Sequence, residues 1–415
     1  MVKKSKSVEL GKLPELGDVP ENMIAQVIRA ERFGEPSTAF QVESVQTPEA
    51  RSGEVIIAVM AAGINYNNVW AARGIPVNVI DERKREGEPY DFHIGGSDAS
   101  GIVYSIGPDV EGIEIGDRVV VHTGYWDADD PWVLAGRDTM LAPSAKIWGY
   151  NTNFGSFAQF CRAQAHQVLP KAPQLSWSEA AAPTLVGATI YRMLHGWAGN
   201  TVKENDLVLV WGGSGGLGSQ AVQLVAAAGA LPVAVVSEES RGEYATNLGA
   251  VGWINRKDFT HWGLPPHISD REGQREWTTG ARAFGKRIWE IAGERRAPNI
   301  VIEHPGEETV PTSIFVCETG GMVVICAGTT GYEAVVDLRY HWTRQKRFQG
   351  SHGTNDEQAR AYNDLVCKGI IDPCRGQVIE FNEIPAAHSA MSRGENVFGN
   401  VVALVGASSH DEGRE

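Results

Sequence analysis

Short apolar runs separated by glycines occupy the chain from residue 24 to about residue 125. The runs lie at 24–30 (IAQVIRA), 53–65 (GEVIIAVMAAGIN), 95–107 (GGSDASGIVYSIG) and 116–124 (GDRVVVHTG). They are rich in valine and isoleucine, which favour strands, and turn-forming glycines bound each run. This pattern predicts a barrel-like β domain rather than a helical one.

The pattern changes after Asp206, where continuous apolar runs alternate with helical stretches. The runs lie at 207–213 (LVLVWGG), 231–237 (LPVAVVS), 299–304 (NIVIEH) and 321–328 (GMVVICAG). A helix of small residues is predicted at 219–229, directly after the first run. Strands that are apolar along their whole length and alternate with helices indicate a parallel sheet covered on both faces. The second part of the chain is therefore predicted to be an α/β domain.

Other segments add to this outline. A pair of helices opening at Ser176 or Ser178 is expected just before the second pattern begins. Residues 125–155 are polar and rich in aromatics, and a loop of that length is usually functional or interfacial. The apolar run at 399–406 is expected to return to the first domain, and residues 408–415 are expected to be disordered.

Composition excludes several classes of protein. The chain has 415 residues and a formal net charge of −14, which argues against nucleic acid or an anionic membrane surface as a partner. No apolar run approaches the ~20 residues that span a bilayer, and the N-terminus lacks the apolar core of a secretory signal. The cysteines are scattered without a Cys-x-x-Cys pair, so neither a disulfide framework nor a zinc ribbon is indicated. A reduced, cytoplasmic enzyme is the expected class.

The glycine-rich stretch 210–219 (VWGGSGGLGS) carries the clearest motif. Its core is Gly213, Ser214, Gly215, Gly216, Leu217 and Gly218, which fits G-x-G-x-x-G between a strand and a helix. In this motif one glycine permits a tight turn, another lets backbone N–H groups approach a pyrophosphate, and the last lets the helix pack on the strand. The positive end of the helix dipole adds to anion binding. The motif predicts a dinucleotide site, although a glycine-rich turn without function is the alternative.

The residues after the second predicted strand favour NADPH over NADH. An acidic residue that ends this strand would hold the ribose 2′-hydroxyl of NAD, but here the strand ends in Ser237. Arg241 follows within one turn, and Arg256 ends the next strand. A hydroxyl with guanidinium groups suits a 2′-phosphate. Glu238 and Glu239 speak against this choice unless they point to solvent.

A β domain, a later dinucleotide domain and a C-terminal return together resemble the medium-chain dehydrogenase/reductase superfamily. Zinc-dependent members of this superfamily carry Gly-His-Glu where this chain has Gly96, Ser97 and Asp98, and they also carry a cysteine-rich lobe. Both features are missing here. Asp98 without histidine or cysteine partners is a poor zinc site, so no metal is expected.

Within the superfamily, the chain resembles the crotonyl-CoA carboxylase/reductases and related enoyl-CoA reductases. The matching segments are AAGINYNNVW (61–70), GGSDASG (95–101), DTMLAPSAKIWGYNTNFGSFAQF (138–160), VWGGSGGLGS (210–219), FGKRIWE (284–290), EHPG (303–306), RYHW (339–342) and GSH (350–352). The long loop at 125–155 and an insertion at 253–290 also resemble this family rather than the quinone reductases, which are shorter.

The resemblance implies an α/β protein with a zinc-free, GroES-like β-barrel catalytic domain and a doubly wound Rossmann domain. We expect an N-terminal tail at 1–23, the GroES-like domain at 24–200, the NADPH-binding domain at 201–365, and a return to the catalytic domain with a C-terminal tail at 366–415. It also implies NADPH-dependent reduction of an enoyl-CoA thioester. The resulting enolate takes CO2 or a proton at Cα, and the enzyme is expected to be a homodimer or homotetramer.

Basic residues gather in two stretches that could hold the CoA phosphates. These are FGKRIWE, with Lys286, and the helix-like RYHWTRQKRF (339–348). A solvated basic face is the alternative for such clusters. The resemblance assigns Lys286, Arg339 and Tyr340 to CoA binding.

The resemblance also implies a pocket for the electrophile. Carboxylating relatives use an asparagine, a Phe-Glu pair and a histidine, and these match Asn67, Tyr150-Asn151 and His352. The alternatives are a loop hydrogen bond for Asn67 and a buried structural imidazole for His352. Tyr150 keeps the aromatic ring, whereas Asn151 replaces a carboxylate by an amide and leaves the efficiency of carboxylation open.

The remaining nicotinamide contacts are expected from loops at the carboxyl edge of the parallel sheet. These contacts are His304 and Gly306 of EHPG together with Ala327 and Gly328. Three other functions stay open: an enoyl-CoA reductase that does not carboxylate, a quinone or alkenal reductase, and a nucleotide-binding protein without turnover.

Overall fold

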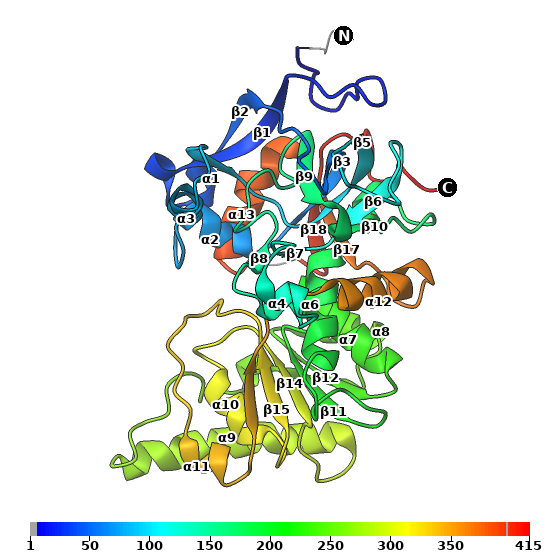
Figure 1. Cartoon of the computed structure of the whole chain (residues 1–415). Coiled ribbons are helices and arrows are strands. Elements are labelled where there is room, and N and C mark those ends of the chain that lie inside the picture. The colour runs from blue at the N-terminus through cyan, green and yellow to red at the C-terminus, as the bar shows by residue number, and fades with distance from the viewer. Residues whose placement is uncertain (1–5, 396) are drawn as a thin grey trace. The chain divides into compact units, whose positions relative to one another are not determined.

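The computed structural model describes residues 6–395 and 397–415, and the chain forms two compact units (Figure 1). Unit 1 comprises residues 1–188, 353–369 and 373–415. Unit 2 comprises residues 189–352 and 370–372, so its sequence is an insertion into unit 1. Helix α6 (Thr184–His195) runs through the first boundary between them.

Unit 1 is built on a seven-stranded sheet in which β3 (Glu54–Ile64) is central and buried along its whole length. The sheet order is β10 (Val168–Pro170), β6 (Arg118–Val121), β5 (Ala99–Ile106), β3, β18 (Asn400–Leu404) and β17 (Arg375–Glu380), and β9 (Phe160–Gln164) also pairs with β3. The prediction of a β domain is confirmed. The predicted return of the chain is also correct, since β18 pairs antiparallel with β3.

Smaller elements complete unit 1. A second sheet has the order β2 (Phe40–Gln46), β1 (Asn22–Arg29) and β4 (Phe92–Ile94), and β7 (Gly124–Tyr125) pairs with β8 (Lys146–Ile147). The α-helices are α1 (Pro36–Ala39), α2 (Asn67–Arg73), α3 (Val79–Arg85), α4 (Pro131–Leu134), α5 (Trp177–Ala180), α12 (Asp356–Cys367) and α13 (Ile384–Ser392). Single turns of 3-10 helix lie at η1 (Ala30–Arg32), η2 (Thr139–Leu141), η3 (Ala165–Gln167) and η5 (Phe381–Glu383). Ser176 caps α5 through a capping box, which selects it over Ser178 as the helix start.

The C-terminal residues are ordered, contrary to the disorder expected from their polar sequence. The Trp177 N–H donates to the carbonyl of Glu412 at 2.8 Å, and Arg414 pairs with Glu179 at 2.7 Å. Arg118 pairs with Glu415 at 2.8 Å. The prediction failed because the partners of these residues lie far away in the sequence.

Unit 2 is a six-stranded, wholly parallel sheet, as predicted. Its order is β13 (Gly252–Asn255), β12 (Leu231–Val236), β11 (Leu207–Trp211), β14 (Ile300–Glu303), β15 (Met322–Ile325) and β16 (Arg347–Gly350). The helices are α7 (Gly216–Ala227), α8 (Glu239–Asn247), α9 (Arg271–Ala292), α10 (Val310–Val316) and α11 (Leu338–Trp342), with a 3-10 turn at η4 (Arg256–Asp258). The helix-like stretch 339–348 is only partly helical, because Arg347 already pairs with Met322 as part of β16.

Alternation along β11 explains how both faces of this sheet are buried. Leu207, Leu209 and Trp211 point to one face and pack in a core with Phe284 of α9 and Ile314 of α10. The intervening valines of β11 are also fully buried. Helices α7 and α8 lie on one side of the sheet and α9 and α10 on the other (Figure 1). In the described part of the chain, no helix is both long and apolar enough to cross a membrane.

Candidate active site

The glycine turn after β11 has a separate steric reason for each of its critical glycines. Gly212 has φ +61°, a conformation that favours glycine. A Cβ on Gly213 would lie 2.6 Å from Ala234 Cβ, and one on Gly218 would lie 2.1 Å from the Gly212 carbonyl oxygen. Sequence reasoning missed Gly212, although the Gly-Gly doublet that directly follows the strand was an available signal.

The start of α7 is suited to an anion. Its N-cap is Gly215, which makes no side-chain cap bond, and a Cβ there would find only the Gly212 carbonyl oxygen, at 3.7 Å. The first N–H groups of a helix have no partners within the helix, and the dipole is positive at this end. The turn therefore fits the pyrophosphate of a dinucleotide.

Arg241 lies directly against this turn. Its Nη1 donates to Ser214 Oγ at 3.2 Å, and its Nε donates to Glu238 Oε1 at 3.1 Å. Glu238 thus takes part in orienting the guanidinium, which was not foreseen. Arg241 thus lies beside the turn that would hold the pyrophosphate. The adenosine half of a dinucleotide would extend from this turn toward β12.

Ser237 and Arg256 follow the two strands beyond β11. Ser237 comes directly after β12, and Arg256 opens the 3-10 turn after β13. Arg256 pairs with Glu308 at 3.8 Å, and both side chains are about half exposed. Arg241 and Arg256 therefore have different acidic partners.

The loop after β14 crosses over the glycine turn. Burial lowers the pKa of His304 to about 4, so its ring is neutral at pH 7, and its Nε2 donates to the Trp211 carbonyl at 3.2 Å. A Cβ on Gly212 would lie 2.6 Å from this ring. The Cα of Gly328 lies 3.0 Å from where a Cβ on Gly306 would be. The structure thus brings His304 beside the glycine turn and Gly328 beside Gly306, which follows His304 on the same loop.

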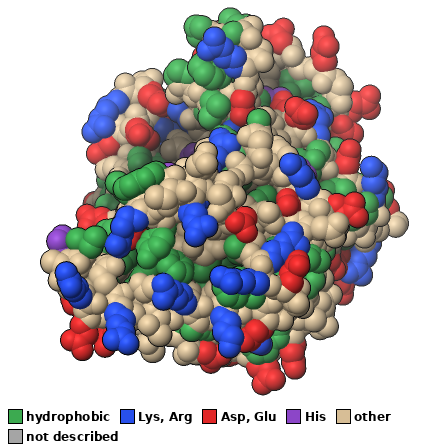
Figure 2. Space-filling model, turned by 90° about the horizontal axis from the view of Figure 1, so that it is seen from below, with side chains coloured by type: hydrophobic (Ala, Val, Ile, Leu, Met, Phe, Trp, Pro, Cys, Tyr) green, Lys and Arg blue, Asp and Glu red, His purple; other side chains and the backbone are tan. Residues whose placement is uncertain are grey.

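The residues expected to bind CoA are not gathered into one patch of unit 2. Lys286 is exposed on α9 and lies 3.6 Å from Glu290. Arg339 donates to Gln274 Oε1 at 3.2 Å, and Gln274 lies on α9 twelve residues, or about 18 Å, before Lys286. Tyr340 packs edge-on against Phe315 with ring centroids 4.8 Å apart. Figure 2 likewise shows Lys and Arg side chains spread among acidic and apolar ones on one face.

In unit 1, Asn67 is held by an amide network. Its Nδ2 donates to the buried Ser97 Oγ at 2.8 Å, and its Oδ1 accepts from Asn68 Nδ2 at 2.9 Å. Asn68 in turn accepts the Gly96 N–H at 3.2 Å. Ser97 therefore helps to orient Asn67, a role that the absence of the Gly-His-Glu motif alone did not reveal.

The turn that carries Tyr150 and Asn151 packs against the same 95–97 segment. Gly149 has φ +67°, and a Cβ there would lie 1.9 Å from the Gly96 carbonyl oxygen. Tyr150 is buried. Asn151 Oδ1 accepts the Ile147 N–H at 3.0 Å, so one of its polar atoms is used within the turn.

Asp98 is a structural residue in this arrangement. It is fully buried, and burial raises its pKa well above the ordinary value. Its Oδ1 accepts the Leu185 N–H at 2.6 Å in the first turn of α6, and its Oδ2 accepts from Asn65 at 2.7 Å. His352 belongs to unit 2, where it follows β16 and is exposed.

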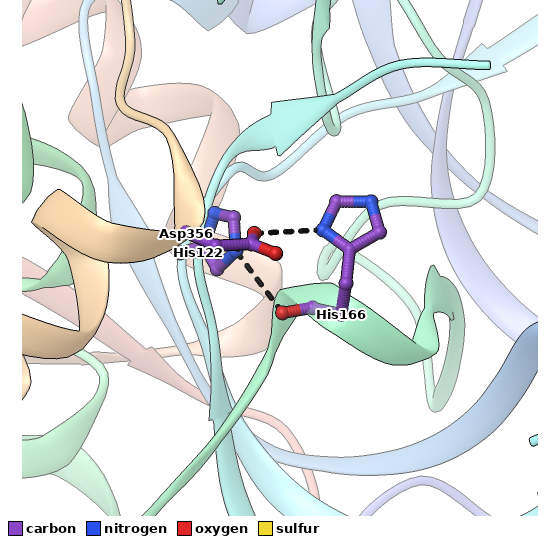
Figure 3. A group of neighbouring side chains, drawn as sticks. All are labelled: His122, His166 and Asp356. Atoms are coloured by element: carbon purple, nitrogen blue, oxygen red, sulfur yellow. Dashed lines mark hydrogen bonds and ion pairs between the residues drawn. The ribbon is translucent and has the colours of Figure 1, made fainter. Parts of the chain in front are cut away.

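Three side chains with metal-ligand chemistry meet in unit 1, although the sequence did not single them out (Figure 3). Asp356 Oδ1 lies 2.9 Å from His122 Nε2 and 2.9 Å from His166 Nδ1. His122 Nδ1 accepts the Gly124 N–H at 3.2 Å, which places the ring proton on Nε2. A metal at Nε2 would have to displace that proton while Nδ1 is already occupied. The donor set therefore suits hydrogen bonds rather than a metal ion.

Acid sensitivity should follow from this cluster. Burial lowers the pKa of His122 below its ordinary value, despite the opposing bond to Asp356. In the unfolded chain His122 binds a proton below about pH 6.5, whereas the buried ring of the folded protein stays neutral to lower pH. The unfolded state therefore binds more protons, and the free energy of unfolding falls as the pH drops below that value. We expect His122→Gln to reduce the slope of unfolding free energy against pH by up to about 1.4 kcal/mol per pH unit.

Urea unfolding at pH 7.5, 6.5 and 5.5 measures this slope. The exposed His267 provides the matched control, because His267→Gln should keep the wild-type slope. Equal slopes for wild type and His122→Gln would show that His122 does not contribute.

Comparisons with known proteins agree with this description. A family model described as "Alcohol dehydrogenase GroES-like domain" matches residues 51–174, and one described as "Zinc-binding dehydrogenase" matches residues 216–368. The chain is 50% identical over 399 residues to the crotonyl-CoA carboxylase/reductase of Cereibacter sphaeroides, covering 96% of this chain and 91% of that protein. It is 38% identical over 362 residues to the crotonyl-CoA reductase of Streptomyces collinus, covering 85% and 78%.

Solved structures show the same relationship. The crotonyl-CoA carboxylase/reductase AntE in complex with NADP matches with a TM-score of 0.93 and 48% identity, over 98% of this chain and 100% of that chain. The 2-octenoyl-CoA carboxylase reductase CinF, with NADP and 2-octenoyl-CoA, matches with a TM-score of 0.87 and 35% identity, over 95% and 90%.

The fold and the glycine turn place the chain among the medium-chain dehydrogenases/reductases. Within that superfamily, the matches confirm the resemblance found in the sequence. The chain belongs to the crotonyl-CoA carboxylase/reductase family.

Proposed function

We propose that the protein catalyses NADPH-dependent reduction of an α,β-unsaturated CoA thioester, with capture of the enolate at Cα by CO2 or by a proton. The observation that carries this proposal is 50% identity, across 96% of the chain, to a crotonyl-CoA carboxylase/reductase. The structure of CinF in complex with NADP and 2-octenoyl-CoA supports a thioester of this class. A cytoplasmic location and a homodimer or homotetramer are part of the same proposal.

In this proposal unit 2 holds the cofactor. Bound NADPH would supply the hydride that adds to Cβ of the enoyl thioester. The glycine turn at 213–218 and the start of α7 would hold the pyrophosphate, while Ser237, Arg241 and Arg256 would hold the 2′-phosphate. His304, Ala327 and Gly328 would position the nicotinamide. The hydrogen bond from His304 Nε2 to the Trp211 carbonyl oxygen holds the neutral ring in place in this loop.

Hydride addition at Cβ moves the π electrons onto the thioester oxygen and gives an enolate. Its Cα then forms a bond to the carbon of CO2, giving a carboxylate, or takes a proton. Asn67, held by Ser97, has a second Nδ2 hydrogen that could be donated to a CO2 oxygen. We assign Tyr150 and Asn151, on the turn that packs against the 95–97 segment, to the capture of CO2 as well. His352 of unit 2 is proposed for the same step, and Lys286, Arg339 and Tyr340 are proposed to bind the CoA portion.

A panel of enoyl-CoA esters tests the proposal. NADPH oxidation is followed with and without bicarbonate, and product mass distinguishes carboxylated from protonated product. Turnover of quinones or alkenals without CoA esters would favour the reductase alternative. NADPH binding without turnover of any of these substrates would favour a binding protein.

Arg241→Ala should raise the NADPH dissociation constant about tenfold, because a charge-assisted bond contributes on the order of 1.5–3 kcal/mol. NADH lacks the 2′-phosphate, so its affinity should change little. Fluorescence titration of both cofactors measures the difference. Equal losses for NADPH and NADH would remove Arg241 from the 2′-phosphate site.

Lys286→Ala and Arg339→Ala should each weaken enoyl-CoA binding, more at low salt than at high salt, because exposed pairs are screened. NADPH affinity should stay at the wild-type value. Arg287 is the matched control, since it lies next to Lys286 and pairs with the same Glu290. CoA-ester titrations that show no change in either variant, or an equal change in Arg287→Ala, would contradict the assignment.

A further inference from the structure

A carboxylate lies fully buried at the carboxyl end of β14, next to the proposed nicotinamide loop. Glu303 Oε1 accepts from Thr309 Oγ1 at 2.6 Å and from the Gly306 N–H at 3.2 Å. Its Oε2 accepts from Ser313 Oγ at 2.6 Å. The sequence placed Glu303 in a matching segment but gave it no function.

The hydrogen-bond directions suit an ionised carboxylate. Trp211 Nε1 donates to Ser313 Oγ at 2.9 Å, so the Ser313 hydroxyl proton is available for Glu303. The N–H of Gly306 can only donate. Burial raises the pKa of Glu303 to about 7, and the bonds from Ser313, Thr309 and Gly306 oppose that rise. Such a site is costly for a charge, and perturbed buried acids of this kind cluster at functional sites.

Glu303 also organises the loops at this edge of the sheet. Glu303 holds the loop after β14 through its bonds to Gly306 and Thr309. This loop contacts the glycine turn through His304. On its other side, Thr330 donates to the Pro305 carbonyl through both its N–H at 2.8 Å and its Oγ1 at 2.9 Å. Gly306 forms a bridge with Gly331. One carboxylate therefore anchors the loop that connects the ends of β11, β14 and β15.

The strand order indicates which half of a dinucleotide lies here. Arg241, proposed for the 2′-phosphate, follows β12 on one side of β11, and β14 lies on the other side. A dinucleotide crosses the sheet at the point where strand order reverses, so its nicotinamide half would lie over β14. The oxidised nicotinamide ring carries a positive charge that the reduced ring lacks.

We propose that Glu303 is a positioning residue whose negative charge favours NADP+ over NADPH at this site and so assists departure of the hydride. The inference rests on the proposed NADPH site. It requires no thioester, so failure of enoyl-CoA turnover would leave its test intact, whereas a wild-type protein that binds neither cofactor form would overturn the proposed function itself.

The test compares dissociation constants for NADP+ and NADPH, by calorimetry, in wild type, Glu303→Gln and Glu303→Met. Both substitutions remove the charge; glutamine keeps the shape and methionine replaces a buried ion with an apolar chain. We expect the NADP+ constant to rise about tenfold and the NADPH constant to change less than about threefold. Glu307 is the matched control, because it is an exposed acid on the same loop, and Glu307→Gln should keep the wild-type ratio.

An unchanged ratio of the two constants, or an equal ratio change in Glu307→Gln, would overturn the proposal. Thermal unfolding is measured on every variant. If neither Glu303 variant shows a native unfolding transition, Glu303 maintains the fold rather than the cofactor preference, and the proposal is likewise overturned.

Discussion

Gly218→Val should abolish NADPH binding, with a loss of at least about a hundredfold in affinity. A Cβ on Gly218 would lie 2.1 Å from the Gly212 carbonyl oxygen and 2.7 Å from Gly213 Cα. These are backbone atoms that no side-chain rotation can move, so the turn itself must open. Opening it separates the N–H groups that would hold the pyrophosphate. Fluorescence titration with NADPH measures the effect.

Gly285→Ala is the matched control for this prediction. Gly285 lies inside α9, where a Cβ would make an ordinary contact of 3.6 Å with Val316. Alanine in a helix interior is favoured over glycine by up to about 1 kcal/mol, so this variant should keep its affinity and melt no lower than wild type. Wild-type NADPH affinity in Gly218→Val would show that the cofactor does not use this turn.

Asn151→Glu combined with Tyr150→Phe should raise the carboxylated fraction of the product. In the unaltered protein, Asn151 has an amide where the family resemblance implies a carboxylate, and its Oδ1 already accepts the Ile147 N–H. We therefore expect incomplete carboxylation, with substantial reduced product even at saturating bicarbonate. Hydride transfer should persist without CO2, because the enolate forms before the electrophile is chosen.

Product mass spectrometry decides this prediction. Asn151→Gln is the control, since glutamine has the length of glutamate without its charge, and it should not raise the carboxylated fraction. Near-complete carboxylation by the unaltered protein would show that Asn151 substitutes fully for the carboxylate.

The parts that could be predicted from sequence are those in which neighbouring residues determine the structure. The parallel sheet follows from its apolar runs, and the glycine turn follows from a strand, closely spaced glycines and a helix in immediate succession. The start of α5 could be narrowed to Ser176 or Ser178, because the residues that cap a helix lie within its own first turn.

The parts that could not be predicted depend on partners far apart in the chain. His122 meets Asp356 across 234 positions, and no periodicity announces such a pair. Glu303 lay inside the predicted strand run at 299–304 without a function of its own, because its burial depends on contacts with Thr309 and Ser313 later in the chain. The sequence of β16 resembles the end of a helix, and its strand conformation depends on pairing with β15.

The position of β18 sets an order for assembly during synthesis. This strand, Asn400–Leu404, lies between β3 and β17 in the central sheet of unit 1, although β3 is made more than 300 residues earlier. Unit 2 is almost continuous in sequence, so it can fold on the ribosome before β18 is made. During that time the edge of β3 that pairs with β18 has no partner strand. An unpaired edge strand readily joins other chains. The nascent protein is therefore most exposed to aggregation between the emergence of β3 and that of β18, and a chaperone that shields this edge would have to act through most of translation.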